Sequence, residues 1–154
     1  RWQHLADAVT FIPYGTLVDH FQHECYEHPE YTPEQRNAAW SRLAAVYMPW
    51  LKPEESLGFY SSGRAWQRQR HIYISPFYYI DYCLAQTVSL EFWAMIKRDK
   101  AAAWEKYMAY TRLGGTLTFR ELLDRAGLDS PFEPETLKAV AEAAKAWLDA
   151  NSGV

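Results

Sequence analysis

The chain has 154 residues, of which 49% are apolar and 16% aromatic, and its formal net charge is −3. This length suffices for one domain with a full hydrophobic core, so we expect a single helical domain over residues 1–154. Because basic residues are not in excess, nucleic-acid binding through bulk electrostatics is excluded, and we expect no nucleic-acid partner.

The opening residues already show a helical pattern. Residues 1–12 resemble the end of one helix, and Pro13 is placed to open a second helix that runs to about His28, because proline fits the first turn of a helix. Since the chain begins at Arg1 in the middle of this pattern, we expect it to be a piece of a longer polypeptide.

A capping box marks the next helix. Thr32 is the expected N-cap, Pro33 occupies the first helical position, and Gln35 completes the box. Apolar residues at helical spacing then continue to about residue 47. Prolines and glycines between residues 49 and 63 predict a loop.

The second half of the chain predicts four more helices. Apolar residues recur at helical spacing, Thr118 and Glu121 form a second capping box, and glycines stand where helices end. The expected helices cover residues 76–99, 101–113 and 118–127, followed by a last one after Pro134. No run alternates Val, Ile or Thr with polar residues, so we predict an all-α fold, a multi-helix bundle.

Cysteine usage and hydropathy indicate the compartment. Cys25 and Cys83 are too few for a disulfide framework, and no signal peptide is evident, so we expect a cytoplasmic protein. The most apolar stretch, residues 72–96, is interrupted by acidic side chains and tyrosines that would be costly in hydrocarbon. We therefore expect no membrane partner.

The densest set of potential metal ligands lies between residues 19 and 28. On a helix, His20, His23 and Glu27 would share one face, a spacing that could hold zinc. Their order, H-x-x-H-E, matches neither H-E-x-x-H nor H-x-x-E-H. A solvated or inter-domain helix face explains these residues better, and we expect no metal ligands in this chain.

A thiol nucleophile is a weaker candidate. Cys83 and His71 supply the two residue types that such chemistry needs. Cys83, however, lies in an apolar part of a predicted helix, where burial raises the pKa of a thiol. An inert packing cysteine is the better interpretation.

Residues 63–86 join a basic and aromatic turn to a helix that carries several tyrosines. On a helix, Tyr79 and Tyr82 would be neighbours, and the turn at Ser75 would let His71 join them. Two phenols and an imidazole can donate hydrogen bonds to a carbonyl and to the oxyanion that forms when it is attacked. The alternative is a set of buried tyrosines whose hydroxyls bond to backbone carbonyls.

Three separated segments resemble the oligoendopeptidase F branch of the thimet-oligopeptidase-like zinc metallopeptidases. They are FIPYGTLVDHFQHECYEHP, GRAWQRQRHIYISPFYYIDYCLAQTVSLEFW and SPFEPETLKAVAEAAKAWL, at residues 11–29, 63–93 and 130–148. The resemblance covers essentially the whole chain in the order expected for the C-terminal part of such enzymes. It implies a helical catalytic domain around a channel in which a zinc-bound water cuts short peptides.

The resemblance also implies residue roles. His71 corresponds to the histidine of the substrate-binding loop, while Tyr79 and Tyr82 correspond to the catalytic tyrosine pair that faces the scissile carbonyl. Tyr78 could substitute for either as a substrate-binding residue. Ser75 and its following proline replace a glycine and a further tyrosine of the thimet-type branch, so that tyrosine is not assigned here.

The zinc-binding motif of that family is absent, because the chain contains no H-E-x-x-H. The resemblance places the zinc ligands in the remainder of the parent catalytic domain, so the isolated chain should be inactive. The expected partners are short peptide substrates, the rest of the parent and, for the fragment, other copies of itself. The alternatives are a stand-alone helical peptide-binding module and a protein-interaction role for the aromatic surface.

Overall fold

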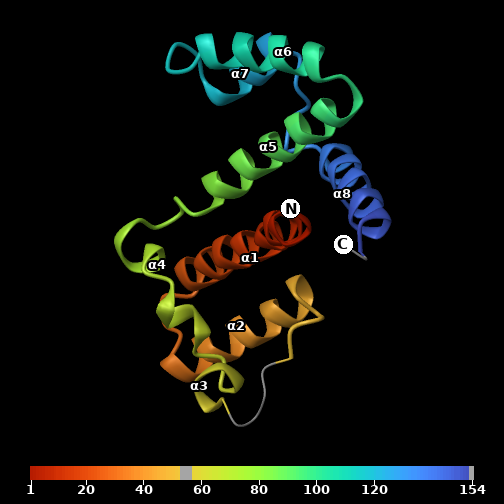
Figure 1. Ribbon diagram of the computed structural model, residues 1–154. Helices are drawn as coiled ribbons and strands as arrows, with labels where there is room; N and C mark the ends of the chain where they lie inside the picture. The colour runs from red at the N-terminus through yellow and green to blue at the C-terminus, as the bar shows by residue number, and fades with distance from the viewer. Residues whose placement is uncertain (53–56, 153–154) are drawn as a thin grey trace. The chain divides into compact units, whose positions relative to one another are not determined.

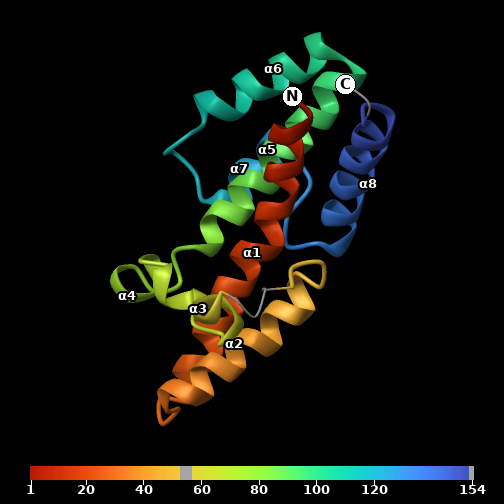
Figure 2. The same ribbon diagram turned by 60° about the horizontal axis from the view of Figure 1, so that its bottom comes forward.

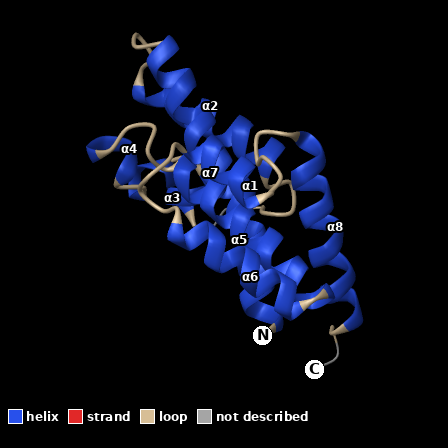
Figure 3. Cartoon of the chain, turned by 90° about the horizontal axis from the view of Figure 1, so that it is seen from above, coloured by secondary structure: helices blue, strands red, loops and turns tan. Residues whose placement is uncertain are grey.

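The computed structural model describes residues 1–52 and 57–152. Within these residues there are eight α-helices, one short 3-10 helix and no strand (Figure 3), which confirms the all-α prediction. None of the described helices is both long and apolar enough to cross a membrane. In chain order the elements are α1 (Trp2–Glu27), α2 (Pro33–Tyr47), α3 (Gly58–Ser61), η1 (Ala65–Arg68), α4 (His71–Ile74), α5 (Ile80–Arg98), α6 (Lys100–Arg112), α7 (Phe119–Ala126) and α8 (Pro134–Ala150).

The chain divides into two compact units. One unit contains Arg1–Val9 and Leu84–Val154, and the other contains Thr10–Cys83. Helices α1 and α5 each pass from one unit into the other. The expectation of a single domain stays a prediction.

The unit Thr10–Cys83 is built around α1 and α2, which lie side by side in Figures 1 and 2. Leu17, Val18 and Phe21 from α1 are almost completely buried, and they meet Trp40 and Leu43 from α2. The ring of Phe21 lies edge-on to the indole of Trp40, with 5.3 Å between the centroids. The segment that follows η1 packs against this aromatic core.

In the other unit α6 packs beside α7, as Figure 1 shows. The hydrophobic cluster combines Val88 and Phe92 of α5 with Leu123 and Ala126 of α7. Gly127, at φ +62°, ends α7 in the left-handed conformation that favours glycine. The described residues of this unit carry none of the predicted catalytic residues.

The capping predictions are confirmed. Thr32 accepts a hydrogen bond from the N–H of Gln35, whose side chain accepts from the Thr32 N–H in return. Thr118 and Glu121 form the same reciprocal pair at the start of α7. A turn of helix, α3, interrupts the loop expected between residues 49 and 63, in which residues 53–56 lie outside the described part of the chain.

The predicted helix boundary at Pro13 is wrong, because α1 is one helix that contains Pro13. Proline removes the N–H that would bond to the Val9 carbonyl and typically costs about 3 kcal/mol or more inside a helix. Buried side chains on both sides of it, Leu5 and Leu17, outweigh that cost. The boundary between the two units falls at Val9, where this bond is missing.

Candidate functional site

The segment between α4 and α5 is a turn rather than the beginning of a helix. A helix starting at Pro76 was predicted, but α5 begins at Ile80, so Tyr79 precedes it. The reason is Phe77, whose φ of +61° is incompatible with a right-handed helix. Its backbone N–H donates to Oε1 of the buried Gln22 at 3.0 Å, which holds the turn against α1.

This turn brings His71 together with three tyrosines. The ring centroid of His71 lies 4.9 Å from that of Tyr79 and 5.7 Å from that of Tyr82. The two tyrosine rings are 5.4 Å apart, and the ring of Tyr78 lies 5.3 Å from that of Tyr82. The four sequence-predicted residues therefore form one aromatic cluster, in which His71 belongs to α4 and Tyr82 to α5, while Tyr78 and Tyr79 lie in the turn between them.

The tyrosines differ in their access to a ligand. Tyr79 is only 9% exposed and packs among Phe11, Tyr14 and His71, whereas Tyr78 and Tyr82 are 48% and 39% exposed. The side chains of Tyr78 and Tyr82 are therefore accessible from solvent. Tyr79 is instead buried, and its ring packs against the rings of His71 and Tyr82.

Burial and neighbouring groups raise the pKa values of Tyr79 and Tyr82. Desolvation, followed by the nearby Tyr14 and Cys83, raises the pKa of Tyr79 to about 12. The pKa of Tyr82 is also raised, first by desolvation and then by its hydrogen bond with Tyr78. Each group is therefore a neutral hydroxyl near neutral pH and can donate a hydrogen bond.

A glycine allows the end of the turn to approach α1. A Cβ atom at Gly15 would collide with Sγ of Cys83 and lie 3.7 Å from Cε1 of Tyr79. Cys83 is buried, its Sγ lies 3.6 Å from the carbonyl oxygen of Ile12, and desolvation raises the pKa of its thiol to about 11. This environment is that of a packing cysteine rather than of a nucleophile.

The sequence interpretation missed a hydrogen-bonded chain behind His71. The hydroxyl of Tyr14 donates to Oε1 of Gln69 at 2.9 Å, and Nε2 of Gln69 lies 2.7 Å from Nδ1 of His71. Tyr14 comes from α1 and Gln69 follows η1, 55 positions later. One signal was present, since Gln69 is a polar residue two positions before the candidate histidine.

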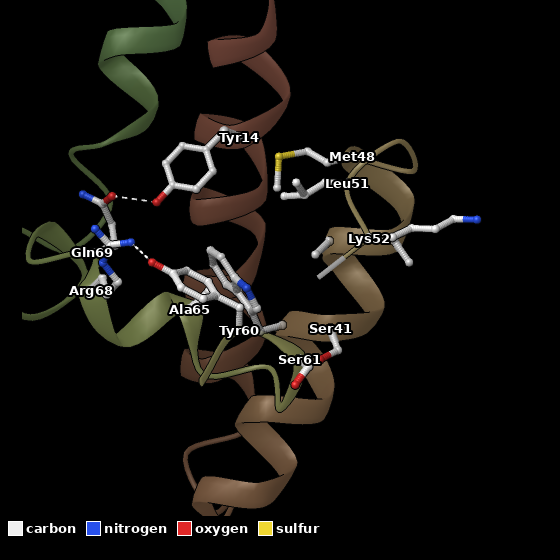
Figure 4. A pocket seen from close by; sticks show the side chains of 13 residues that line it. Tyr14, Ser41, Met48, Leu51, Lys52, Tyr60, Ser61, Ala65, Arg68 and Gln69 are labelled. Carbon is white, nitrogen blue, oxygen red and sulfur yellow. Dashed lines mark hydrogen bonds between the residues drawn. The ribbon is translucent and has the colours of Figure 1, made fainter. Parts of the chain in front are cut away.

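Tyr14 and Gln69 also line a cavity of about 680 Å³ within the unit Thr10–Cys83. Figure 4 shows Tyr14 and Gln69 on one side of this cavity and Met48 and Leu51 on the other. Volumes of this size are typical of small-molecule binding sites. The other lining residues are Trp40, Ser41, Ala44, Ala45, Lys52, Tyr60, Ser61, Ala65 and Arg68.

Two of the candidate zinc ligands on α1, His20 and His23, contact other polar groups. Nδ1 of His20 lies 2.9 Å from the hydroxyl of Tyr47, and Nε2 of His23 lies 3.4 Å from a carboxylate oxygen of Asp19. Among the described residues no three His, Cys, Asp or Glu side chains are grouped so that they could hold a metal ion. The residues that the structure describes therefore do not fit a zinc site.

Comparison with solved structures identifies the relationship. Two solved structures superpose on this chain with a TM-score of 0.89 each. One is a provisionally identified oligoendopeptidase F with 44% sequence identity to this chain, and the other is PZ peptidase A with an inhibitor, with 42% sequence identity. Both comparisons cover 97% of this chain and 26% of the solved chain. The chain is an oligoendopeptidase F-like segment. It therefore spans about a quarter of the length of the structures it matches, consistent with the expected C-terminal part of such a protein.

A third solved structure agrees. It is given provisionally as an oligoendopeptidase F from Bacillus anthracis str. Ames, with a TM-score of 0.75, 38% identity, and coverage of 97% of this chain and 23% of that one. No protein-family model matches the chain, and no curated protein matches it significantly. The family recognised from three sequence segments is thereby confirmed, while the roles of His71, Tyr78, Tyr79 and Tyr82 stay predictions.

Proposed function

We propose that this chain is the substrate-binding part of a zinc oligopeptidase that hydrolyses short peptides. The observation that carries the proposal is the cluster of His71 with Tyr79 and Tyr82 in a segment 44% identical to an oligoendopeptidase F-like structure. In the proposed role, the hydroxyl of Tyr82, a residue that is 39% exposed, donates a hydrogen bond to the scissile carbonyl and to the oxyanion that develops from it. His71 donates to the peptide backbone beside it.

The proposed task of each residue follows from how exposed its side chain is. Tyr82 and Tyr78 can meet the substrate, while the buried Tyr79 supports their rings and the imidazole of His71. The adjoining apolar cavity, lined by Trp40 and Met48, has the size and lining to receive an apolar side chain of the peptide. A phenol is suited to this work because its hydroxyl is protonated at neutral pH and can donate a hydrogen bond.

Zinc, which the family resemblance implies, would need ligands from the rest of the parent protein, because the described residues do not fit it. We therefore propose that the isolated chain binds peptides without cleaving them. The parent's activity, its substrates and its cytoplasmic location all belong to this proposal.

The test compares two polypeptides. The product of the complete reading frame that contains this chain should hydrolyse an internally quenched peptide and lose that activity with a chelator, whereas the 154-residue chain should only bind the peptide. A complete reading frame that lacks H-E-x-x-H and shows no hydrolysis would contradict the proposal. Peptide binding in that case would favour the alternative of a helical binding module.

A further inference from the structure

Gln69 lies between two hydrogen-bond partners, Tyr14 and His71. The Tyr14 hydroxyl donates to the carbonyl oxygen of the amide at 2.9 Å. The amide nitrogen is then left to face Nδ1 of His71, at 2.7 Å. Figure 4 shows the bond from Tyr14, which lies on the first of the helices, to Gln69.

An amide nitrogen can only donate a hydrogen bond, so Nδ1 of His71 must accept one. Nδ1 then carries a lone pair, and the neutral imidazole holds its single proton on Nε2. The chain of contacts thus selects one form of His71 and frees its Nε2–H for another partner.

We propose that Gln69 is a positioning residue, which, anchored by Tyr14, holds His71 as an Nε2–H donor toward an acceptor oxygen of the peptide. The inference rests on the proposed function for the identity of that acceptor, a backbone carbonyl. A histidine held in this form cannot accept a hydrogen bond from a peptide N–H at Nε2. The site therefore recognises a carbonyl oxygen at the position next to Tyr82.

The rings around His71 support this arrangement. Tyr79 and Tyr82 both present their rings roughly perpendicular to the imidazole, at interplanar angles of 62° and 87°. These contacts restrict the tilt of the imidazole, while the bond to Gln69 fixes its rotation. Positioning therefore comes from α1, through Tyr14, as well as from the segment that carries the histidine.

The tautomer can be measured directly by NMR on the chain labelled with ¹⁵N-histidine. Five histidines give few resonances, and a His71→Asn variant assigns the one from His71. We expect a protonated Nε2 and an unprotonated Nδ1. A neutral His71 protonated on Nδ1 would overturn the inference.

Substitution of Gln69 supplies the sharper test. In Gln69→Glu the amide donor becomes a carboxylate acceptor, so the proton should move to Nδ1 of His71. Gln67→Glu adds the same charge at an exposed position of η1 and should leave the tautomer unchanged. Tyr14→Phe, which removes the anchor but keeps the ring, should give a mixture of the two tautomers. An unchanged Nε2–H form in both folded Gln69→Glu and Tyr14→Phe would contradict the inference.

Kinetics separates this inference from the proposed function. In an active parent enzyme, Gln69→Glu should lower kcat/KM for peptide hydrolysis about 10-fold to 100-fold more than Gln67→Glu, as expected for loss of an oriented hydrogen bond near the reacting group. Equal effects of the two substitutions would overturn the positioning role while leaving the peptidase proposal intact. A parent with no peptidase activity would overturn the proposed function, and the NMR result would still decide the tautomer of His71.

Discussion

The buried side chain of Gln22 holds the backbone of Phe77 in place. Its Oε1 accepts from the Phe77 N–H at 3.0 Å, and its Nε2 donates to the Val18 carbonyl at 3.2 Å. Gln22 is only 1% exposed, so both bonds are shielded from water. A glutamine on the inner face of α1 thus fixes the turn from which Tyr79 and Tyr82 are presented.

We predict that Gln22→Leu destabilises the chain by about 1–3 kcal/mol, because the Phe77 N–H would lose its partner in a buried setting. Gln67→Leu, at an exposed position, should change stability by less than about 0.5 kcal/mol. Chemical denaturation followed by circular dichroism measures both. Equal stability of the two variants would show that the Phe77 turn does not depend on Gln22.

Gly15 should tolerate no side chain. Gly15→Ala gains up to about 1 kcal/mol of helix propensity but places a methyl group against Sγ of Cys83, and overpacking typically costs about 1–3 kcal/mol. We expect net destabilisation. In Gly15→Ala combined with Cys83→Ala the collision is removed, so the two changes should be non-additive in a double-mutant cycle. Additive effects would mean that the methyl group introduced by Gly15→Ala and the thiol of Cys83 do not compete for the same space.

Substitutions of Tyr82 and Tyr79 should have different effects on the kinetics of the parent enzyme. Tyr82→Phe removes a hydroxyl that the proposed function uses in the transition state, so kcat should fall about 10²-fold to 10³-fold with little change in KM. Tyr79→Phe should have a smaller effect on kcat, because its side chain is 9% exposed. An unchanged kcat in both variants would contradict the proposed role of the pair.

Glu91 should make stability depend on pH. Its Oε1 accepts from the Asp129 N–H at 3.0 Å, while its buried Oε2 has no hydrogen-bond partner among the described residues. Desolvation raises the pKa of Glu91 in the folded state, although the bond from Asp129 opposes this. The folded state therefore binds the proton more tightly than the unfolded state, and this contribution to stability is lost as pH rises through the folded pKa.

Glu91→Gln keeps an acceptor and removes the buried charge. We expect this variant to be more stable than the original chain at about pH 7, by roughly 1–3 kcal/mol, with the difference shrinking toward about pH 4. Melting temperatures of the two proteins at the two pH values test this. A Glu91→Gln variant that is less stable at about pH 7 would contradict the interpretation.

The isolated chain should self-associate. Large apolar side chains are exposed within each unit, among them Trp50 at 60%, Leu51 at 56% and Trp104 at 59%. Exposed apolar surface of this kind normally meets another protein surface. Light scattering should show dimers or larger species at high concentration, and Trp50→Lys with Leu51→Lys should reduce them. A monomer at all concentrations would argue against this expectation.

Local rules explain how much of this molecule could be predicted from the sequence. The capping boxes at Thr32 and Thr118 depend on contacts within four residues, so the starts of α2 and α7 follow from the sequence. The break at Pro13 was wrongly predicted because the local cost of proline is outweighed by the packing of buried residues along α1. A helix-breaking residue ends a helix only where tertiary contacts do not outweigh its local cost.

The sequence alone determined the helical class, the family and the four residues of the aromatic cluster. Helical periodicity, helix caps and three contiguous motifs can each be recognised within a short stretch of residues. The tertiary structure decided the rest. It placed Tyr79 before α5 rather than on it, set the left-handed turn at Phe77 against Gln22, and joined Tyr14 to His71 through Gln69. The bonds from Tyr14 to Gln69 and from Phe77 to Gln22 each join residues 55 positions apart, and side-chain hydrogen bonds across such distances leave no periodic trace in the sequence.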